Sequence, residues 1–154
     1  MTETEQREAF VEHALSWMFT PFVHRAEVVH GGVDCAHLVS GAIKACDTPA
    51  TERVKNFSWP KYSPDWFRHQ KDPEAVLVEN LKKLMGEVTT PQPGDIAVLK
   101  FGTCYCHCAI VIAWPRKILE AWPARSYVAT VDPATDPLWS CRDVRFFSPW
   151  SEPK

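Results

Sequence analysis

Apolar side chains recur at three- and four-residue spacing between residues 5 and 19, with Glu and Gln on the opposite face. This spacing predicts an amphipathic helix. Its apolar stripe consists of Phe10, Ala14, Trp17 and Met18. We expect the helix to stop before Thr20-Pro21, because proline disfavours helical geometry in the residue before it.

The same spacing returns in residues 35–46, where it predicts a second, buried helix. Its stripe consists of Leu38, Val39, Ala42, Ile43 and Cys46. A third helix is predicted over 73–85, with Asp72 as its cap and Pro73 in its first turn. Residues 49–72 show no period and are rich in proline and aromatics. A segment of this kind inside a domain is usually functional or well packed, and we expect it to line a substrate groove.

After Pro93-Gly94-Asp95 the pattern changes to short apolar runs that are typical of strands. The predicted strands are 96–100, 106–113, 118–122, 126–131 and 143–147. Helices followed by a small antiparallel sheet indicate an α+β fold, with N-terminal helices packed on a C-terminal sheet.

Composition narrows the class of protein. With 154 residues, 45% hydrophobic and 23% charged, the chain is predicted to form one globular domain over residues 1–154. A net charge of -2 provides no electrostatic basis for binding nucleic acid or an anionic membrane. The polar, acidic N-terminus does not resemble a secretory signal, so we expect synthesis in the cytoplasm. In an unsignalled chain the six cysteines are expected to be free thiols.

Chemistry is concentrated at Gly31-Gly32-Val33-Asp34-Cys35, directly before the second helix. Asp34 occupies the position of a helix N-cap, which places Cys35 in the first turn. Unpaired N–H groups and the helix dipole at that position lower the pKa of a thiol and favour the nucleophilic thiolate. The backbone N–H of Cys35 is also placed to bind an oxyanion. This local pattern fits a nucleophile and a buried structural cysteine about equally.

A nucleophilic cysteine needs a base, and the strand half contains one histidine, His107. Taken alone, a histidine in an apolar strand is more often a core residue, whereas the cysteine motif favours a base. Glu120 is the only charged residue within the next strand, residues 118–122, and is our candidate for orienting His107. The strand pattern alone favours a solvent-facing Glu120.

The run Cys104-Tyr105-Cys106-His107-Cys108 suggests a metal site as an alternative. In a strand, however, alternate side chains lie about 6.6 Å apart, which is too far for two thiolates on one zinc ion with bonds of about 2.3 Å. We therefore predict no metal and no other cofactor, and we interpret these cysteines as small core or edge residues.

Three of these motifs together resemble one known family. Gly31-Gly32-Val33-Asp34-Cys35-Ala36-His37-Leu38-Val39, Pro93-Gly94-Asp95-Ile96-Ala97-Val98 and His107-Cys108-Ala109-Ile110-Val111 are similar to motifs of the NlpC family of papain-like cell-wall cysteine peptidases. Tyr62-Ser63-Pro64-Asp65-Trp66 and the tail 139–147 resemble its phage and gene-transfer-agent branch.

The resemblance implies a minimal papain-like fold and hydrolysis of amide bonds in peptidoglycan stem peptides, with a location in a phage or prophage tail and other tail proteins as partners. By matching positions, Cys35 is the nucleophile and His107 the base. Where the family commonly has a second histidine, this chain has Glu120-Ala121. Where it often has tyrosine after a proline, Phe22 follows Pro21, so one hydroxyl is missing. We expect Asp34, Phe22, His24 and Trp66 to contact the substrate.

Two other classes of function remain compatible with these residues. One is a tail-tip or assembly protein that keeps the fold without turnover. The other is a thiol acyltransferase or amidase that uses the same Cys–His pair on another substrate.

Overall fold

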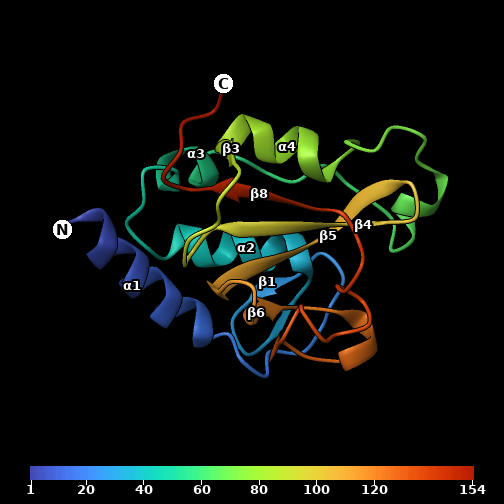
Figure 1. Ribbon diagram of the computed structural model, residues 1–154, viewed down its shortest axis with the longest axis horizontal. Helices are drawn as coiled ribbons and strands as arrows, with labels where there is room; N and C mark the ends of the chain where they lie inside the picture. The colour runs from blue at the N-terminus through green and yellow to red at the C-terminus, as the bar shows by residue number, and fades with distance from the viewer.

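The computed structural model describes residues 1–154 and places helices against one face of a six-stranded antiparallel sheet (Figure 1). The helices are α1 (Glu3–Leu15), α2 (Cys35–Lys44), α3 (Thr51–Lys55) and α4 (Leu77–Leu84). The sheet has the order β3-β8-β4-β5-β6-β7. Its strands are β3 (Gly86–Val88), β4 (Ile96–Phe101), β5 (Cys104–Ala113), β6 (Lys117–Glu120), β7 (Ala129–Val131) and β8 (Val144–Ser148). This architecture confirms the predicted α+β class.

Smaller elements lie around the two layers. A two-stranded hairpin of β1 (Glu27–Val28) and β2 (Gly32–Val33) precedes α2. Two 3-10 turns, η1 (Trp66–His69) and η2 (Pro123–Arg125), lie in the connections before α4 and after β6. None of the helices is both long enough and apolar enough to cross a membrane.

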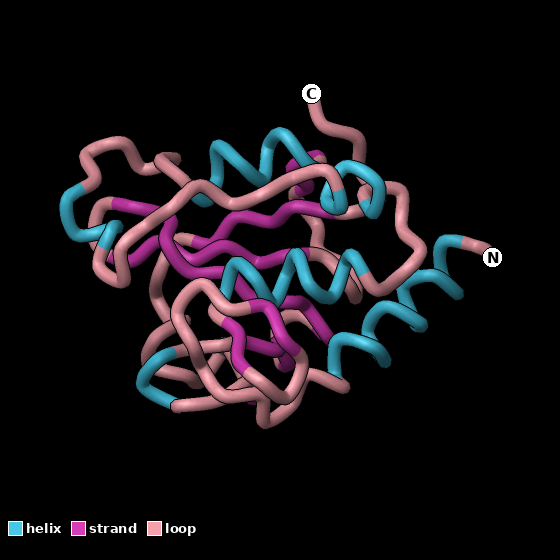
Figure 2. The backbone as a smooth tube through the Cα atoms, turned by 180° about the vertical axis from the view of Figure 1, so that it is seen from behind, coloured by secondary structure: helices cyan, strands magenta, loops and turns pink.

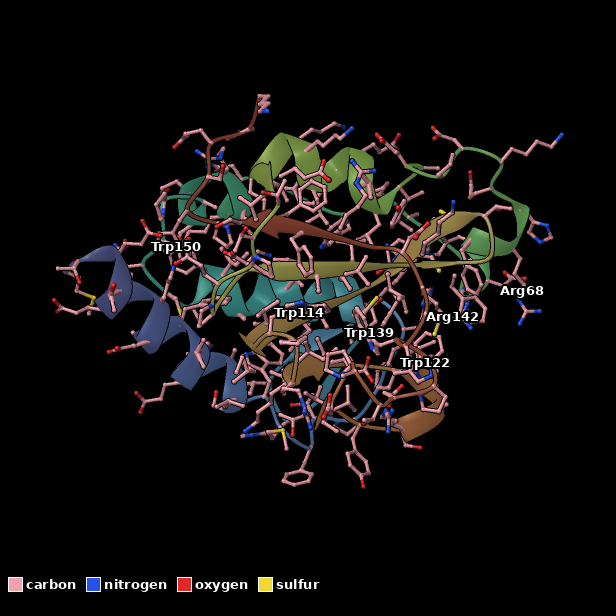
Figure 3. The ribbon with its side chains drawn as sticks, viewed as in Figure 1. Arg68, Trp114, Trp122, Trp139, Arg142 and Trp150 are labelled. Atoms are coloured by element: carbon pink, nitrogen blue, oxygen red, sulfur yellow. The ribbon has the colours of Figure 1, made fainter.

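The larger core lies between the helices and the sheet. Figure 2 shows α2 crossing the helical face of the sheet, where it packs against the central strand β5. Gly41 of α2 allows α1 and its following turn to approach, because a Cβ at this position would lie 2.8 Å from the Trp17 ring. A smaller core covers the opposite face, where Trp139 packs on Leu99 and Val111. Figure 3 shows Trp114 and Trp139 on this second face.

Most predicted elements are present, with shifted ends. Each of the five predicted strands overlaps an observed strand, whereas α1 ends at Leu15 and leaves Trp17 and Met18 in the following turns. The predicted cap at Asp72 is wrong, because the helix predicted over 73–85 corresponds to α4, which begins only at Leu77. Asp72 instead accepts a hydrogen bond from the backbone N–H of Glu74, so its side chain closes a turn ahead of the helix.

The Pro93-Gly94-Asp95 motif forms the tight turn into β4. Gly94 has a φ of 92°, which side-chain-bearing residues rarely adopt. The Gly94 N–H donates to the Val111 carbonyl, and the Val111 N–H donates to the Asp95 carbonyl. These bonds tie the start of β4 to β5 and thereby set the register of the strand that carries His107.

Candidate active site

Cys35 is the first residue of α2, directly after the capping residue Asp34. The Asp34 carboxylate accepts hydrogen bonds from the backbone N–H of His37 at 2.9 Å and of Arg25 at 2.8 Å. Burial opposes its ionisation, but hydrogen bonds from His37 and Tyr62 outweigh burial and hold the pKa of Asp34 below its ordinary value. The predicted cap is therefore present and places the Cys35 thiol at the positive end of the helix.

His107 lies on β5 beside a bulge. Leu99 of β4 pairs with His107 while Lys100 pairs with Tyr105, so that Cys106 is the extra residue on β5. A bulge changes the direction of side chains at this point of a strand. As a result, Cys106 and His107 both line the same cleft although they are neighbours in sequence.

Glu120, at the end of β6, holds the imidazole of His107. Its Oε1 lies 2.8 Å from Nε2 of His107. Glu120 pairs with Ala109, two residues beyond His107 on the neighbouring strand, which makes His107 and Glu120 diagonal neighbours on one face. The solvent-facing position that the strand pattern favoured is wrong, because Glu120 is fully buried.

The burial of Glu120 depends on residues outside its strand. Trp139 donates its indole N–H to Oε1 at 2.8 Å, and Arg125 donates Nε–H to Oε2 at 3.1 Å. Burial opposes ionisation, but the hydrogen bonds from His107 and Trp139 and the charges of His107 and Arg125 hold the pKa of Glu120 below its ordinary value. The carboxylate is therefore charged and fixed in place.

The Cys35 thiol and the His107 imidazole interact directly, and each shifts the pKa of the other. A hydrogen bond from Cys108 and the interaction with His107 outweigh burial and lower the pKa of Cys35 to about 5. Burial opposes the charge on His107, but its bonds with Cys35 and Glu120 raise its pKa to about 9. Since Nε2 of His107 is bonded to Glu120, Nδ1 is the nitrogen left for Cys35. Between these pKa values the pair is a thiolate and an imidazolium.

A cleft of about 420 Å³ opens at this pair. Cys35 and His107 both line it, as do all four residues expected to contact the substrate: Phe22, His24, Asp34 and Trp66. Two of these already have internal partners. The Asp34 carboxylate accepts hydrogen bonds from the backbone N–H groups of His37 and Arg25 and from the Tyr62 hydroxyl. Nε2 of His24 is 2.9 Å from the Tyr62 carbonyl oxygen. Phe22 and Trp66 contribute apolar surface.

Tyr62 is the residue of the cleft that sequence reasoning did not single out. Its hydroxyl donates to Oδ2 of Asp34 and lies 3.1 Å from Nδ1 of His37. Burial and the Asp34 charge raise the pKa of Tyr62, so the phenol remains protonated. The cleft thus contains a tyrosine hydroxyl although Phe22 has none. The signal in the sequence was a phenol among the aromatics of 59–67, but nothing there separated Tyr62 from its neighbours.

The remaining cysteines form no second centre. All six cysteines are free thiols. The structure brings together no group of three His, Cys, Asp or Glu side chains that could hold a metal ion. Cys104, Cys106 and Cys108 are buried on β5, and Cys108 lies with its Sγ 3.3 Å from the Cys35 carbonyl oxygen.

Comparison of the sequence with protein-family models gives no match, and comparison with curated proteins gives none either. Solved structures do match the fold. The NlpC/p60 domain of the peptidoglycan hydrolase SagA aligns over 90% of this chain and 96% of its own, with a TM-score of 0.54 and 14% identity. NlpC2 from Trichomonas vaginalis aligns over 99% of this chain, with a TM-score of 0.62 and 11% identity.

A third structure, an NLP/P60-family protein similar to a lipoprotein from Staphylococcus aureus, aligns over 94% of this chain with a TM-score of 0.52 and 15% identity. The chain spans less than half of the Trichomonas and Staphylococcus proteins, 49% and 42% of their lengths. The α+β fold of this chain is therefore the fold of NlpC/p60 domains.

Proposed function

We propose that this protein is a cysteine hydrolase that cleaves amide bonds in peptidoglycan stem peptides. The observation that carries the proposal is that Cys35 contacts His107, and His107 contacts the buried Glu120, at the edge of a cleft. A nucleophile at a helix start, a base in contact with it and a fixed carboxylate behind the base are the parts that acyl transfer by a thiol requires.

Each step of the reaction has a residue to perform it. The Cys35 thiolate attacks the substrate carbonyl, and a C–S bond forms while the carbonyl π electrons move to oxygen. The backbone N–H of Cys35 faces that oxyanion, and one such donor contributes about 3–4 kcal/mol in known hydrolases. His107 then gives its proton to the amide nitrogen as the C–N bond breaks. Water, deprotonated by His107, hydrolyses the thioester and restores the thiolate.

The substrate class is supported by the fold and by the motifs. One structural neighbour is described as a peptidoglycan hydrolase, and the motifs around Asp34-Cys35 and His107 resemble those of the NlpC family. The finer proposal is that the chain acts on the cell wall as part of a phage or prophage tail, beside other tail proteins. Support for this location comes from the motifs at 62–66 and 139–147 alone. Detection of the chain by mass spectrometry in purified tail particles is the expected result.

The direct test is digestion of purified peptidoglycan, with the products identified by mass spectrometry. We expect wild-type protein to release peptides cut at one amide bond and Cys35→Ala to release none. Cys141→Ala is the matched control, because Cys141 is an exposed thiol outside the cleft. Undiminished cleavage by Cys35→Ala would refute the proposal. Failure of wild-type Cys35 to react with a thiol probe, with the fold intact, would favour a binding protein without turnover.

A further inference from the structure

Three arginines of this chain have no carboxylate partner, and each lies against an aromatic ring. Arg25 lies over Tyr62, Arg68 over Phe67 and Arg142 over Phe101, with distances from guanidinium carbon to ring centroid of 5.9, 5.9 and 4.5 Å. The other arginines are all ion-paired with Asp or Glu: Arg7, Arg53, Arg116, Arg125 and Arg145. Each guanidinium group without an acidic partner thus lies over an aromatic ring.

Two of the three rings beneath these arginines line the cleft, and the third, Phe101, lies next to it. Tyr62 and Phe67 line it directly. Phe101 lies between two residues that line the cleft, because its ring centroid is 6.2 Å from that of Phe67 and 6.4 Å from that of Trp122. Trp122 also lines the cleft and contacts the catalytic imidazole, with centroids 4.8 Å apart. Figure 3 shows Arg68 and Arg142 at the same end of the molecule as Trp122.

The neighbouring carboxylates do not neutralise this surface. Asp34 is buried, and its carboxylate already accepts hydrogen bonds from His37, Arg25 and Tyr62. Asp65 accepts a hydrogen bond from Ser63 and lies 3.9 Å from His69. Asp143 follows Arg142 in sequence but forms no ion pair with it. Arg25, Arg68 and Arg142 are exposed and lie beside the cleft, outside its lining. In a chain of net charge -2, unpaired cations beside a cleft favour anionic ligands there.

From this arrangement we infer that Arg25, Arg68 and Arg142 form a cationic rim that binds free carboxylates of the substrate peptide on either side of the scissile bond. Each of these guanidinium groups lies beside a ring and has no acidic partner, so its N–H groups are free to bind a carboxylate. The identity of the ligand as a stem peptide rests on the proposed function. The specificity that follows is a preference for stem peptides with free carboxylates over the same peptides in amidated form.

The test separates binding from cleavage. Binding is measured on Cys35→Ala protein by the fluorescence of the cleft tryptophans, using one synthetic stem peptide with free carboxylates and its amidated counterpart. We expect the free form to bind about tenfold more tightly, since each exposed ion pair contributes up to about fivefold in Kd. Arg68→Gln and Arg142→Gln, added singly, should each reduce the preference by about twofold to fivefold. Raising the salt concentration should reduce it as well.

Arg116→Gln is the matched control, because Arg116 is exposed, paired with Asp132 and outside the cleft. It should leave the preference unchanged. Equal binding of the two peptides, or a preference that survives both rim substitutions, would overturn the inference. Cleavage by wild-type protein without preference would overturn the rim and keep the proposed function. Preferential binding without cleavage by wild-type protein would keep the rim and refute the proposed function.

Discussion

At the scale of single residues, the site depends on the contacts that set the pKa values of the Cys35 thiol and the His107 imidazole. Both side chains are deeply placed, yet the contacts around them stabilise the charged form of each. Glu120 brings a full negative charge to the imidazole of His107, because its carboxylate is bonded to Nε2 and its pKa lies below its ordinary value. A charged acceptor binds imidazolium more strongly than neutral imidazole, so the carboxylate favours the resting ion pair.

The ion pair has a pH signature. Cys35 must be deprotonated to attack, so kcat/KM should rise as pH increases through about 5. His107 must be protonated to release the amine, so kcat/KM should fall as pH increases through about 9. In Glu120→Gln the pKa of His107 should decrease, so the fall of kcat/KM at alkaline pH should begin at a lower pH. The maximal kcat/KM of this variant should be roughly 10²- to 10⁴-fold lower than that of the wild type.

Rates of Cys35 alkylation by iodoacetamide across pH provide an independent readout, because only the thiolate reacts. A single rise centred near the ordinary thiol pKa of 9.0 would contradict the ion pair. Glu12→Gln, which alters an exposed carboxylate of α1, should keep the wild-type profile.

At the scale of elements, the start of α2 is fastened to the long connection 56–76. The Tyr62 hydroxyl donates to the same Asp34 carboxylate that caps the helix. One carboxylate therefore holds the hairpin through Arg25, the helix through His37 and the connection through Tyr62. Asp34 consequently fixes both Tyr62, which lines the cleft, and the start of α2, which carries Cys35.

Removing the Tyr62 hydroxyl should weaken the attachment of the connection 56–76 to the start of α2. We expect Tyr62→Phe to lower the free energy of unfolding by about 1–2 kcal/mol, because a hydrogen bond to a charged acceptor is lost while the ring remains. Urea denaturation measures the change. Tyr127→Phe is the matched control, since Tyr127 is 45% exposed and its hydroxyl has no protein partner; its stability should be unaffected. Equal stability of the two variants would show that the Tyr62 bond contributes nothing.

At the scale of the whole molecule, α1 is joined to the sheet through a buried ion pair. Nη1 of Arg7 lies 2.8 Å from Oδ1 of Asp95 and 2.9 Å from the Pro93 carbonyl oxygen. The guanidinium also lies 4.3 Å over the Trp150 ring, near the C-terminal end of the chain. Three segments distant in sequence therefore meet at Arg7, at the turn that sets the register of β4.

Arg7→Met should lower the free energy of unfolding by about 3–5 kcal/mol, because Asp95 would keep a buried charge without its partner. The melting temperature and urea midpoint measure the loss. Arg116→Met breaks an exposed pair and should cost at most about 1 kcal/mol. A loss in Arg7→Met no larger than in Arg116→Met would mean that the pair is well solvated.

Much of this molecule follows from rules that act over a few residues. The Asp34-Cys35 helix start was predictable because an N-cap is a local hydrogen bond, and the strands because their apolar runs are local patterns. The same reasoning failed at Asp72, where the side chain closes a turn ahead of the helix. Short elements such as β3 and the β1–β2 hairpin went unpredicted, because two or three residues carry no period.

The sequence by itself determined the helix start at Cys35, the strand that carries His107 and the order of most helices and strands. Only the tertiary structure decided how Glu120 is used, because its burial depends on Arg125 and Trp139, which reach it from outside its strand. Only the tertiary structure brought Tyr62 to Asp34 and set the three unpaired arginines over aromatic rings in and beside the cleft. Spacing along a chain encodes contacts within an element, whereas contacts between elements depend on register and packing, which local spacing does not specify.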